Sequence, residues 1–275
     1  MQISMIIPVY NGAGKIARTI DSALEQASVL SGQDSVTIHV VDGASTDATL
    51  AEVQAFADPR IRVTSEPDGG MYDALAKGLA AAGGDITCYL PAGETFEPQA
   101  FAIVSEVFAT FPAVHWLTGR SVTRNARGQI VDSLLPHPYH RRFIDCGMHG
   151  TRLAVIQQES TFWRSALNGL VDLDRLRGCK LAGDYLLWKS FCARHPLHVV
   201  NAQLASFTIE PGQLSRQEPG AYRRELRSLR RRPAAWERAA ALLLRQYVKR
   251  TRPGRTARRL LSYDHDRAAW HLPRP

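Results

Sequence analysis

Isolated acidic residues follow short apolar runs in the first hundred residues of this 275-residue chain. Asp42 ends one run, Asp68 stands before a pair of glycines, and Glu94 follows the run Ile-Thr-Cys-Tyr-Leu by four residues. Carboxylates in such loops can bind a divalent cation, and paired glycines let the backbone approach a ligand closely. The loop that carries Glu94 reads Pro-Ala-Gly-Glu, so a cation there would take most of its ligands from elsewhere.

The elements that must position these acids can be predicted from the hydrophobic pattern. Apolar runs and amphipathic segments alternate, which predicts strands over 3–10, 36–42, 61–65 and 85–90, and helices over 15–27, around 50–56, over 71–83 and near 97–110. Alternation at this spacing is typical of an α/β fold, with a mostly parallel, Rossmann-like sheet flanked by helices.

The polar residues after the strands would meet at one edge of that sheet, because ligands bind beyond the carboxyl ends of parallel strands. This group consists of Tyr10, Asn11, Asp42, Asp68 and Glu94. There is no GxGxxG after the first strand and no GxxxxGK[ST] in the chain, which disfavours a dinucleotide oxidoreductase and a P-loop NTPase.

The positive charge is concentrated near the C-terminus. The chain has a net charge of +8, yet residues 216–259 hold fifteen Lys and Arg against three acids, and the remainder holds 19 basic against 23 acidic residues. We therefore divide the chain into a slightly acidic domain, 1–215, and a basic helical extension, 216–275. Such a segment usually contacts phosphates of lipid or nucleic acid.

The extension contains a predicted amphipathic helix that ends at Pro253. One face holds Trp236, Ala240, Leu243 and Tyr247, and another holds Arg238, Arg245, Lys249 and Arg252. This pattern is typical of a helix lying on an anionic membrane, and we take residues 216–260 as the membrane-facing segment. The alternative is a helix packed on the domain with solvated arginines. Nucleic-acid binding is disfavoured because no recognition motif is present.

The remaining composition indicates a cytoplasmic protein. No apolar run reaches ~18 residues, and no basic leader precedes the first apolar run, so we expect neither a membrane-spanning helix nor a signal peptide. The four cysteines lack paired spacing, which indicates a reducing compartment and no zinc site. We expect a protein peripheral to the inner face of the cytoplasmic membrane.

Four motifs in order, IIPVYNG, VVDGASTDAT, EPDGGMYDALAKG and YLPAGETF, continue with QQESTFWRSAL and LAGDYLLW. Over residues 3–210 the chain resembles family 2 glycosyltransferases of the GT-A fold, above all the colanic-acid type that builds bacterial exopolysaccharide and lipopolysaccharide. The resemblance implies an inverting enzyme that moves a sugar from a nucleotide-sugar donor to an acceptor, here a lipid-linked saccharide.

The resemblance also implies roles in donor binding. It assigns nucleotide contacts to Pro8, Tyr10, Asn11, Asp42, Asp68, Gly70 and Lys77, and places Gln158 and Glu159 near the donor sugar. Position 43, where the family has a second acid, is glycine. Alternatives remain open: Asp42 as a turn carboxylate, Asn11 in a plain turn, and Lys77 in an i,i+4 ion pair with Asp73.

For catalysis, the resemblance implies that Asp184 is the general base and that Glu94 binds Mg²⁺ or Mn²⁺. From spacing alone, Asp184 would cap the helix that it opens, a helix with Leu187, Trp188 and Phe191 facing inward. Glu94 could likewise be a glutamate in a surface turn. The rival functions are a nucleotidyltransferase and a non-catalytic protein that binds a sugar nucleotide or a partner.

Overall fold

The computed structural model describes residues 1–209, 220–253 and 257–273. Its central sheet has nine strands in the order β13-β12-β10-β6-β9-β4-β1-β2-β3. The first four strands in the chain run parallel to one another, as the alternating pattern predicted: β1 (Gln2–Val9), β2 (Ser35–Asp42), β3 (Ile61–Ser65) and β4 (Ile86–Tyr89). Val9 pairs with Asp42 and Asp42 with Ser65, so these strand ends meet at one edge.

Beyond β4 the sheet is mixed. One strand runs antiparallel to both of its neighbours, and the others continue the sheet toward the C-terminal hairpin. They are β6 (Trp116–Thr118), β9 (Thr161–Arg164), β10 (His198–Val200), β12 (Leu260–Asp264) and β13 (Ala269–His271).

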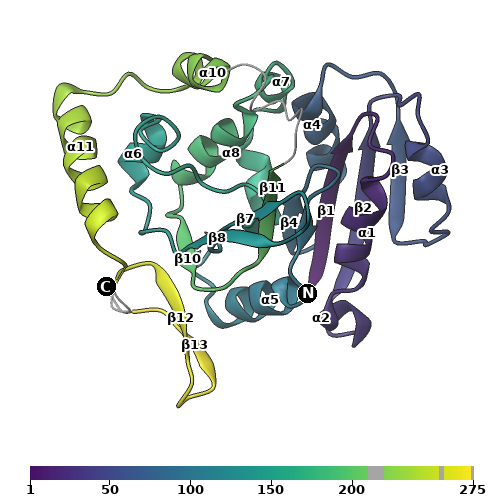
Figure 1. The fold of residues 1–275 in the computed structure, drawn as a ribbon, viewed down its shortest axis with the longest axis horizontal. Coiled ribbons are helices and arrows are strands. Elements are labelled where there is room, and N and C mark those ends of the chain that lie inside the picture. The colour runs from purple at the N-terminus through teal and green to yellow at the C-terminus, as the bar shows by residue number, and fades with distance from the viewer. Residues whose placement is uncertain (210–219, 254–256, 274–275) are drawn as a thin grey trace.

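Helices cover both faces of the sheet (Figure 1). Neighbouring residues of β1 face opposite sides, so Ile6 packs in one buried cluster with α4 and α8, and Ile7 in another with α1 and α5. The helices are α1 (Ile16–Leu24), α2 (Ala27–Leu30), α3 (Thr49–Gln54), α4 (Met71–Ala81), α5 (Ala100–Thr110), α6 (Arg141–Asp145), α7 (Leu173–Arg177) and α8 (Gly183–Cys192), with a 3-10 helix at Ser165–Leu170.

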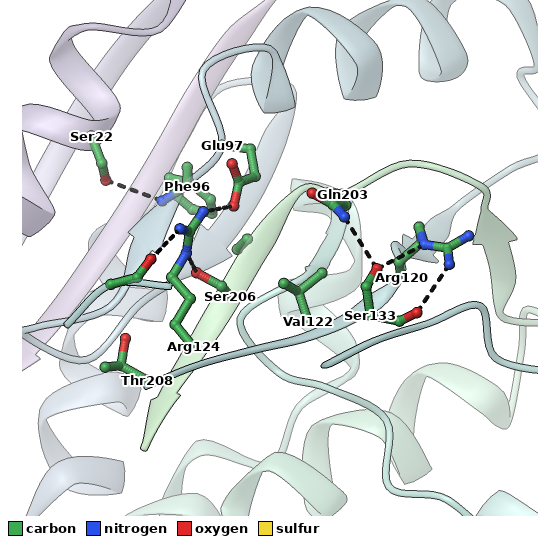
Figure 2. A network of polar contacts seen from close by, with 12 residues as sticks. Ser22, Phe96, Glu97, Arg120, Val122, Arg124, Ser133, Gln203, Ser206 and Thr208 are labelled. Atoms are coloured by element: carbon green, nitrogen blue, oxygen red, sulfur yellow. Dashed lines mark hydrogen bonds and ion pairs between the residues drawn. The ribbon is translucent and has the colours of Figure 1, made fainter. Parts of the chain in front are cut away.

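A second, four-stranded sheet lies beside the first, in the order β5-β11-β7-β8. Its strands are β5 (Thr95–Phe96), β7 (Ser121–Asn125), β8 (Ile130–Leu134) and β11 (Ala205–Ile209). Figure 2 shows how Arg124 joins it to the loop after β5: the guanidinium donates to Ser206 Oγ at 2.7 Å and to Glu97 Oε1 at 2.5 Å. This network holds β11 against the turn that carries Glu94.

Within its described residues, the C-terminal extension forms two helices, α10 (Ala221–Leu229) and α11 (Ala235–Arg250), but it is not helical throughout. The second helix ends at Arg250 rather than Pro253. The chain then returns to the central sheet, where β12 pairs with β10 and buries Leu260 and Leu261. Figure 1 shows α11 at the opposite end of the molecule from β3. In the part of the chain described, no helix is long and apolar enough to cross a membrane. All four cysteines are free and buried.

Candidate active site

Asp42 organises the turn at the carboxyl ends of β1 and β2. Its side chain is completely buried; Oδ2 accepts from Ser45 N–H at 3.0 Å and from Ser65 Oγ at 2.7 Å, and the Ser45 hydroxyl donates to Oδ1. In this structure Asp42 is therefore a turn carboxylate, the alternative left open above. A direct contact with a ligand stays a prediction.

The other residues after β1 frame the same edge. Pro8 is buried, whereas Tyr10 is 64% exposed, so its ring is available as a wall for a planar ligand. Asn11 has a positive φ of 50°, a conformation that asparagine tolerates better than most residues. Its side-chain oxygen accepts from Thr46 N–H at 3.0 Å and fixes the loop after β2.

Asp68 lies directly over Gly43. Its Oδ1 accepts from Gly70 N–H at 2.8 Å, and a Cβ added at position 43 would come within 2.8 Å of Oδ2. Gly70 has a φ of +121°, which residues with side chains rarely adopt. Because position 43 is a glycine, it leaves room for the Asp68 carboxylate from the loop before α4. The loop after Asp42 and the loop that carries Asp68 therefore meet at one place.

Lys77 does form an ion pair, but not with Asp73 as the spacing suggested. Its Nζ lies 2.9 Å from Glu66 Oε1 and donates to Pro67 O at 3.3 Å. Asp73 instead accepts from Gly69 N–H at 2.8 Å and lies 3.6 Å from Arg177 Nε. Lys77 thus supports the loop that carries Asp68, and its contact with a nucleotide stays a prediction.

Three further carboxylates are buried near the ends of β4 and α8. Glu94, Glu159 and Asp184 are 7%, 8% and 8% exposed. Burial raises the pKa of Glu159 to about 8, with further contributions from the negative charges of Glu94 and Asp184. Because the charges of Glu94 and Asp184 both act on Glu159, and such effects are strongest at short range, we call these three acids the acidic cluster.

The polar residues before β9 hold the segment that carries Glu159. Gln158 Nε2 donates to Tyr89 O at 2.6 Å, at the end of β4. The side chain of Gln157 exchanges two hydrogen bonds of 2.8 Å with the backbone of Val122 in β7. Gln158 is therefore next to the acidic cluster, but its described contact is with the backbone.

Asp184 lies in the first turn of α8, whose Leu187, Trp188 and Phe191 are buried as predicted. It does not cap the helix, because Ala182 is at the cap position. Burial raises the pKa of Asp184 to about 7, while hydrogen bonds from Tyr185 N–H at 2.7 Å and Tyr222 OH at 3.3 Å oppose that shift. The negative charge of Glu225 raises the pKa further.

Two residues of α10 complete this site, and the sequence analysis missed both. Tyr222 donates to Asp184, and the carboxylate of Glu225 accepts from the N–H groups of Lys180, Leu181 and Ala182 at 2.7, 2.7 and 3.2 Å. Glu225 thereby binds three successive backbone amides of the segment that leads into α8. The only signal in the sequence was a single acid within an arginine-rich stretch.

The site fits a divalent cation only if most of its ligands come from elsewhere. Glu94 Oε2 accepts from Thr208 N–H at 2.8 Å. Among the described residues, no three His, Cys, Asp or Glu side chains are arranged so that they could together hold a metal ion. A carboxylate has about four lone-pair sites, so a hydrogen bond to one oxygen does not by itself prevent cation binding. Mg²⁺ usually keeps waters and takes oxygens from substrate phosphates.

Comparisons with known proteins identify a family and a shared fold. The sequence pattern of the family described as "Glycosyl transferase family 2" matches residues 4–154. The succinoglycan biosynthesis protein ExoO of Rhizobium meliloti is 36% identical over 98 residues, 35% of this chain and 27% of that protein. Four curated relatives extend well beyond the match, since this chain spans only between 22% and 35% of their length.

Two solved structures share the fold. TarS of S. aureus in complex with UDP-GlcNAc has a TM-score of 0.61 and 17% identity, over 83% of this chain and 65% of that one. The mannosyltransferase PcManGT of Pyrobaculum calidifontis, in complex with GDP-Man and Mn²⁺, has a TM-score of 0.52 and 19% identity, over 76% of this chain and 57% of that one. Both are similar to this chain in architecture.

The raised pKa of Glu159 predicts a pH-dependent effect of Glu159→Gln on stability. Between its unfolded pKa near 4.5 and its folded pKa of about 8, the folded state holds a proton that the unfolded state releases. The free energy of unfolding therefore falls as pH rises through this window. The glutamine variant lacks that loss, so it should gain stability relative to the natural protein, by roughly 1–3 kcal/mol at pH 9.

Urea unfolding at pH 5 and pH 9 measures this difference. Glu106→Gln is the matched control, because Glu106 is an exposed glutamate on α5. A Glu159→Gln variant whose stability follows that of the natural protein at both pH values would contradict the buried, protonated state.

Proposed function

This chain belongs to glycosyltransferase family 2, and we propose that it is an inverting enzyme that moves a sugar from a nucleotide-sugar donor to an acceptor hydroxyl. The observation that carries the proposal is the buried carboxylate of Asp184, whose pKa burial raises to about 7. Direct displacement requires a base on the acceptor side. A base with a pKa near the working pH accepts a proton most effectively.

In this proposal the nucleotide lies at the edge where β1 and β2 end. The exposed ring of Tyr10 packs on the base, and the loops ordered by Asn11, Asp42 and Asp68 contact the ribose and phosphates. Gly70 caps the start of α4 and Lys77 lies farther along that helix. In this proposal both contact the nucleotide, and Gln158 and Glu159 face the donor sugar. This arrangement agrees with the rule that open α/β sheets bind ligands beyond their carboxyl strand ends.

The chemical step is a single displacement. The carboxylate of Asp184 takes the proton of the acceptor hydroxyl while that oxygen forms a bond to the anomeric carbon. The bond between the anomeric carbon and the diphosphate oxygen breaks, and its electron pair leaves with the nucleoside diphosphate. Attack from the face opposite the leaving group inverts the anomeric configuration. Tyr222 and Glu225 hold Asp184 in place during this step.

We also propose that a divalent cation, Mg²⁺ or Mn²⁺, binds to Glu94. A bound cation would neutralise negative charge on the departing diphosphate. The support is the PcManGT structure, which contains Mn²⁺ with GDP-Man, and the buried position of the Glu94 carboxylate in the loop after β4. Lys15 and Arg18 lie against the same loop, where a Cβ at Gly93 would come within 3.0 Å of Arg18 Nη2. These cations provide a second source of positive charge.

The acceptor in our proposal is a lipid-linked saccharide, and the process is bacterial surface polysaccharide assembly. The similarity to a succinoglycan biosynthesis protein supports that role. So does α11, because Trp236, Leu243 and Tyr247 are 54%, 74% and 58% exposed instead of packing inward. An exposed apolar face among cations favours peripheral binding to an anionic membrane, at the inner face of the cytoplasmic membrane.

The first prediction of this proposal concerns Asp184→Asn. The amide keeps the shape of the side chain but cannot take the proton, so turnover should fall ~10²–10⁴-fold with donor affinity nearly unchanged. Asp174→Asn is the control, because Asp174 is 91% exposed on the neighbouring α7. The assay measures free nucleoside diphosphate. Release of pyrophosphate instead would identify a nucleotidyltransferase, and near-normal turnover would exclude Asp184 as the base.

The second prediction concerns the pH dependence of the rate. Turnover should rise with pH through about 7 as Asp184 ionises. Tyr222→Phe removes a hydrogen bond that favours the carboxylate, so the inflection should move to higher pH, with activity recovered in alkaline buffer. Glu225→Gln removes a repulsive charge and should move the inflection to lower pH. If both substitutions moved the inflection in the same direction, Tyr222 and Glu225 would not act on the pKa of Asp184 in the way proposed.

The third prediction concerns the cation. Activity should be lost in EDTA and restored by Mg²⁺ or Mn²⁺, and Glu94→Gln should raise the metal concentration needed for half-maximal activity, since an amide binds cations more weakly than a carboxylate. Glu106→Gln should leave that concentration unchanged. Full activity of the natural protein in EDTA would show that lysine and arginine alone screen the diphosphate.

A further inference from the structure

A cavity of about 550 Å³ opens between α11 and the segment 134–154, away from the donor edge of the sheet. Its volume lies within the range of small-molecule binding sites, ~300–1,000 Å³. Apolar side chains form much of its wall, including Leu135, Leu153, Leu244 and Val248. The family resemblance of residues 3–210 did not predict this cavity, because one of its walls belongs to the C-terminal extension.

The charged residues that line the cavity are all basic: Arg152, Arg245, Lys249, Arg250 and Arg252. In the described ranges, none of these five side chains has an ion-pair partner. Cations left unpaired around an apolar hollow repel one another, and an anion placed among them removes that repulsion. The lining is thus complementary to a molecule that has an anionic head and an apolar body.

We propose that this cavity binds a lipid phosphate, with the phosphate among the cations of Arg152, Arg245 and Lys249 and the hydrocarbon chain against the apolar wall. An inorganic anion would leave the apolar wall without a partner. A nucleic-acid strand would require an extended basic groove with aromatic platforms, and this lining is a compact hollow with few rings. A lipid phosphate uses both parts of the lining.

Residues that line the cavity are neighbours of the residue that contacts the candidate base. His149 lines it, and a Cβ at the adjacent Gly150 would lie 3.5 Å from the hydroxyl of Tyr222, which donates to Asp184. A lipid bound there would hold its head group on the acceptor side of the site. The identification of this lipid as the carrier of the acceptor saccharide rests on the proposed function; binding itself does not.

Binding of decyl phosphate to the full-length protein, measured by calorimetry below the micelle-forming concentration, tests the proposal. We expect saturable binding to one site, with decanol and inorganic phosphate each binding at least about tenfold more weakly. Arg245→Glu should weaken binding roughly tenfold or more, because the change removes an attractive charge and adds a repulsive one. Arg238→Glu, an exposed residue of the same helix outside the cavity, should leave binding unchanged.

A second matched pair tests the apolar wall. Val248→Ser should weaken binding, whereas Leu242→Ser, at an exposed position of α11 outside the cavity, should not. Circular dichroism melting confirms that each variant is folded. Equal effects of Arg238→Glu and Arg245→Glu, or equal affinity for inorganic phosphate, would overturn the proposal in favour of a diffuse basic surface. Asp184→Asn should bind normally, so loss of sugar transfer and loss of lipid binding are distinguishable.

Discussion

The position of Asp184 depends on one carboxylate, that of Glu225, which accepts three backbone N–H groups in the segment 180–182. Those amides precede α8, and Ala182 is buried, where an unpaired amide costs about 1–3 kcal/mol. Because Asp184 follows directly in the chain, the same bonds fix where its carboxylate lies. Tyr222, one turn earlier on α10, then contacts that carboxylate.

This dependence changes how the C-terminal extension should be understood. Leu226 of α10 is completely buried in the same cluster as Ile6 of β1, and β12 extends the central sheet. The division at residue 215 stays a prediction, but removing everything beyond it would remove Glu225, Tyr222 and a strand as well. A truncated chain is therefore a poor test of membrane binding, and single substitutions on α11 separate the two effects.

The sequence was most informative where structure depends on local pattern. The four parallel strands and the inward face of α8 follow from hydrophobic periodicity, which neighbouring residues determine. The second sheet, the antiparallel β9 and the return of β12 depend on pairing between distant segments, for which short strands carry little signal. The site divides in the same way. Asp42 ends β2 and Asp68 follows β3, so the local pattern singled them out. Tyr222 contacts Asp184, and Glu225 the segment before it, from about 40 residues away in the chain.

The cluster of buried acids also constrains how an anionic donor could enter. Three carboxylates that were all ionised would repel a diphosphate, and their mutual repulsion would add to the cost of burial. The structure relieves this in two ways. The raised pKa of Glu159, about 8, keeps that residue mostly protonated at neutral pH, so the cluster carries less negative charge than its composition implies. Lys15 and Arg18 lie next to Gly93 and contribute positive charge. Ionised Asp184 can then remain the principal negative group on the acceptor side, where a proton has to be taken.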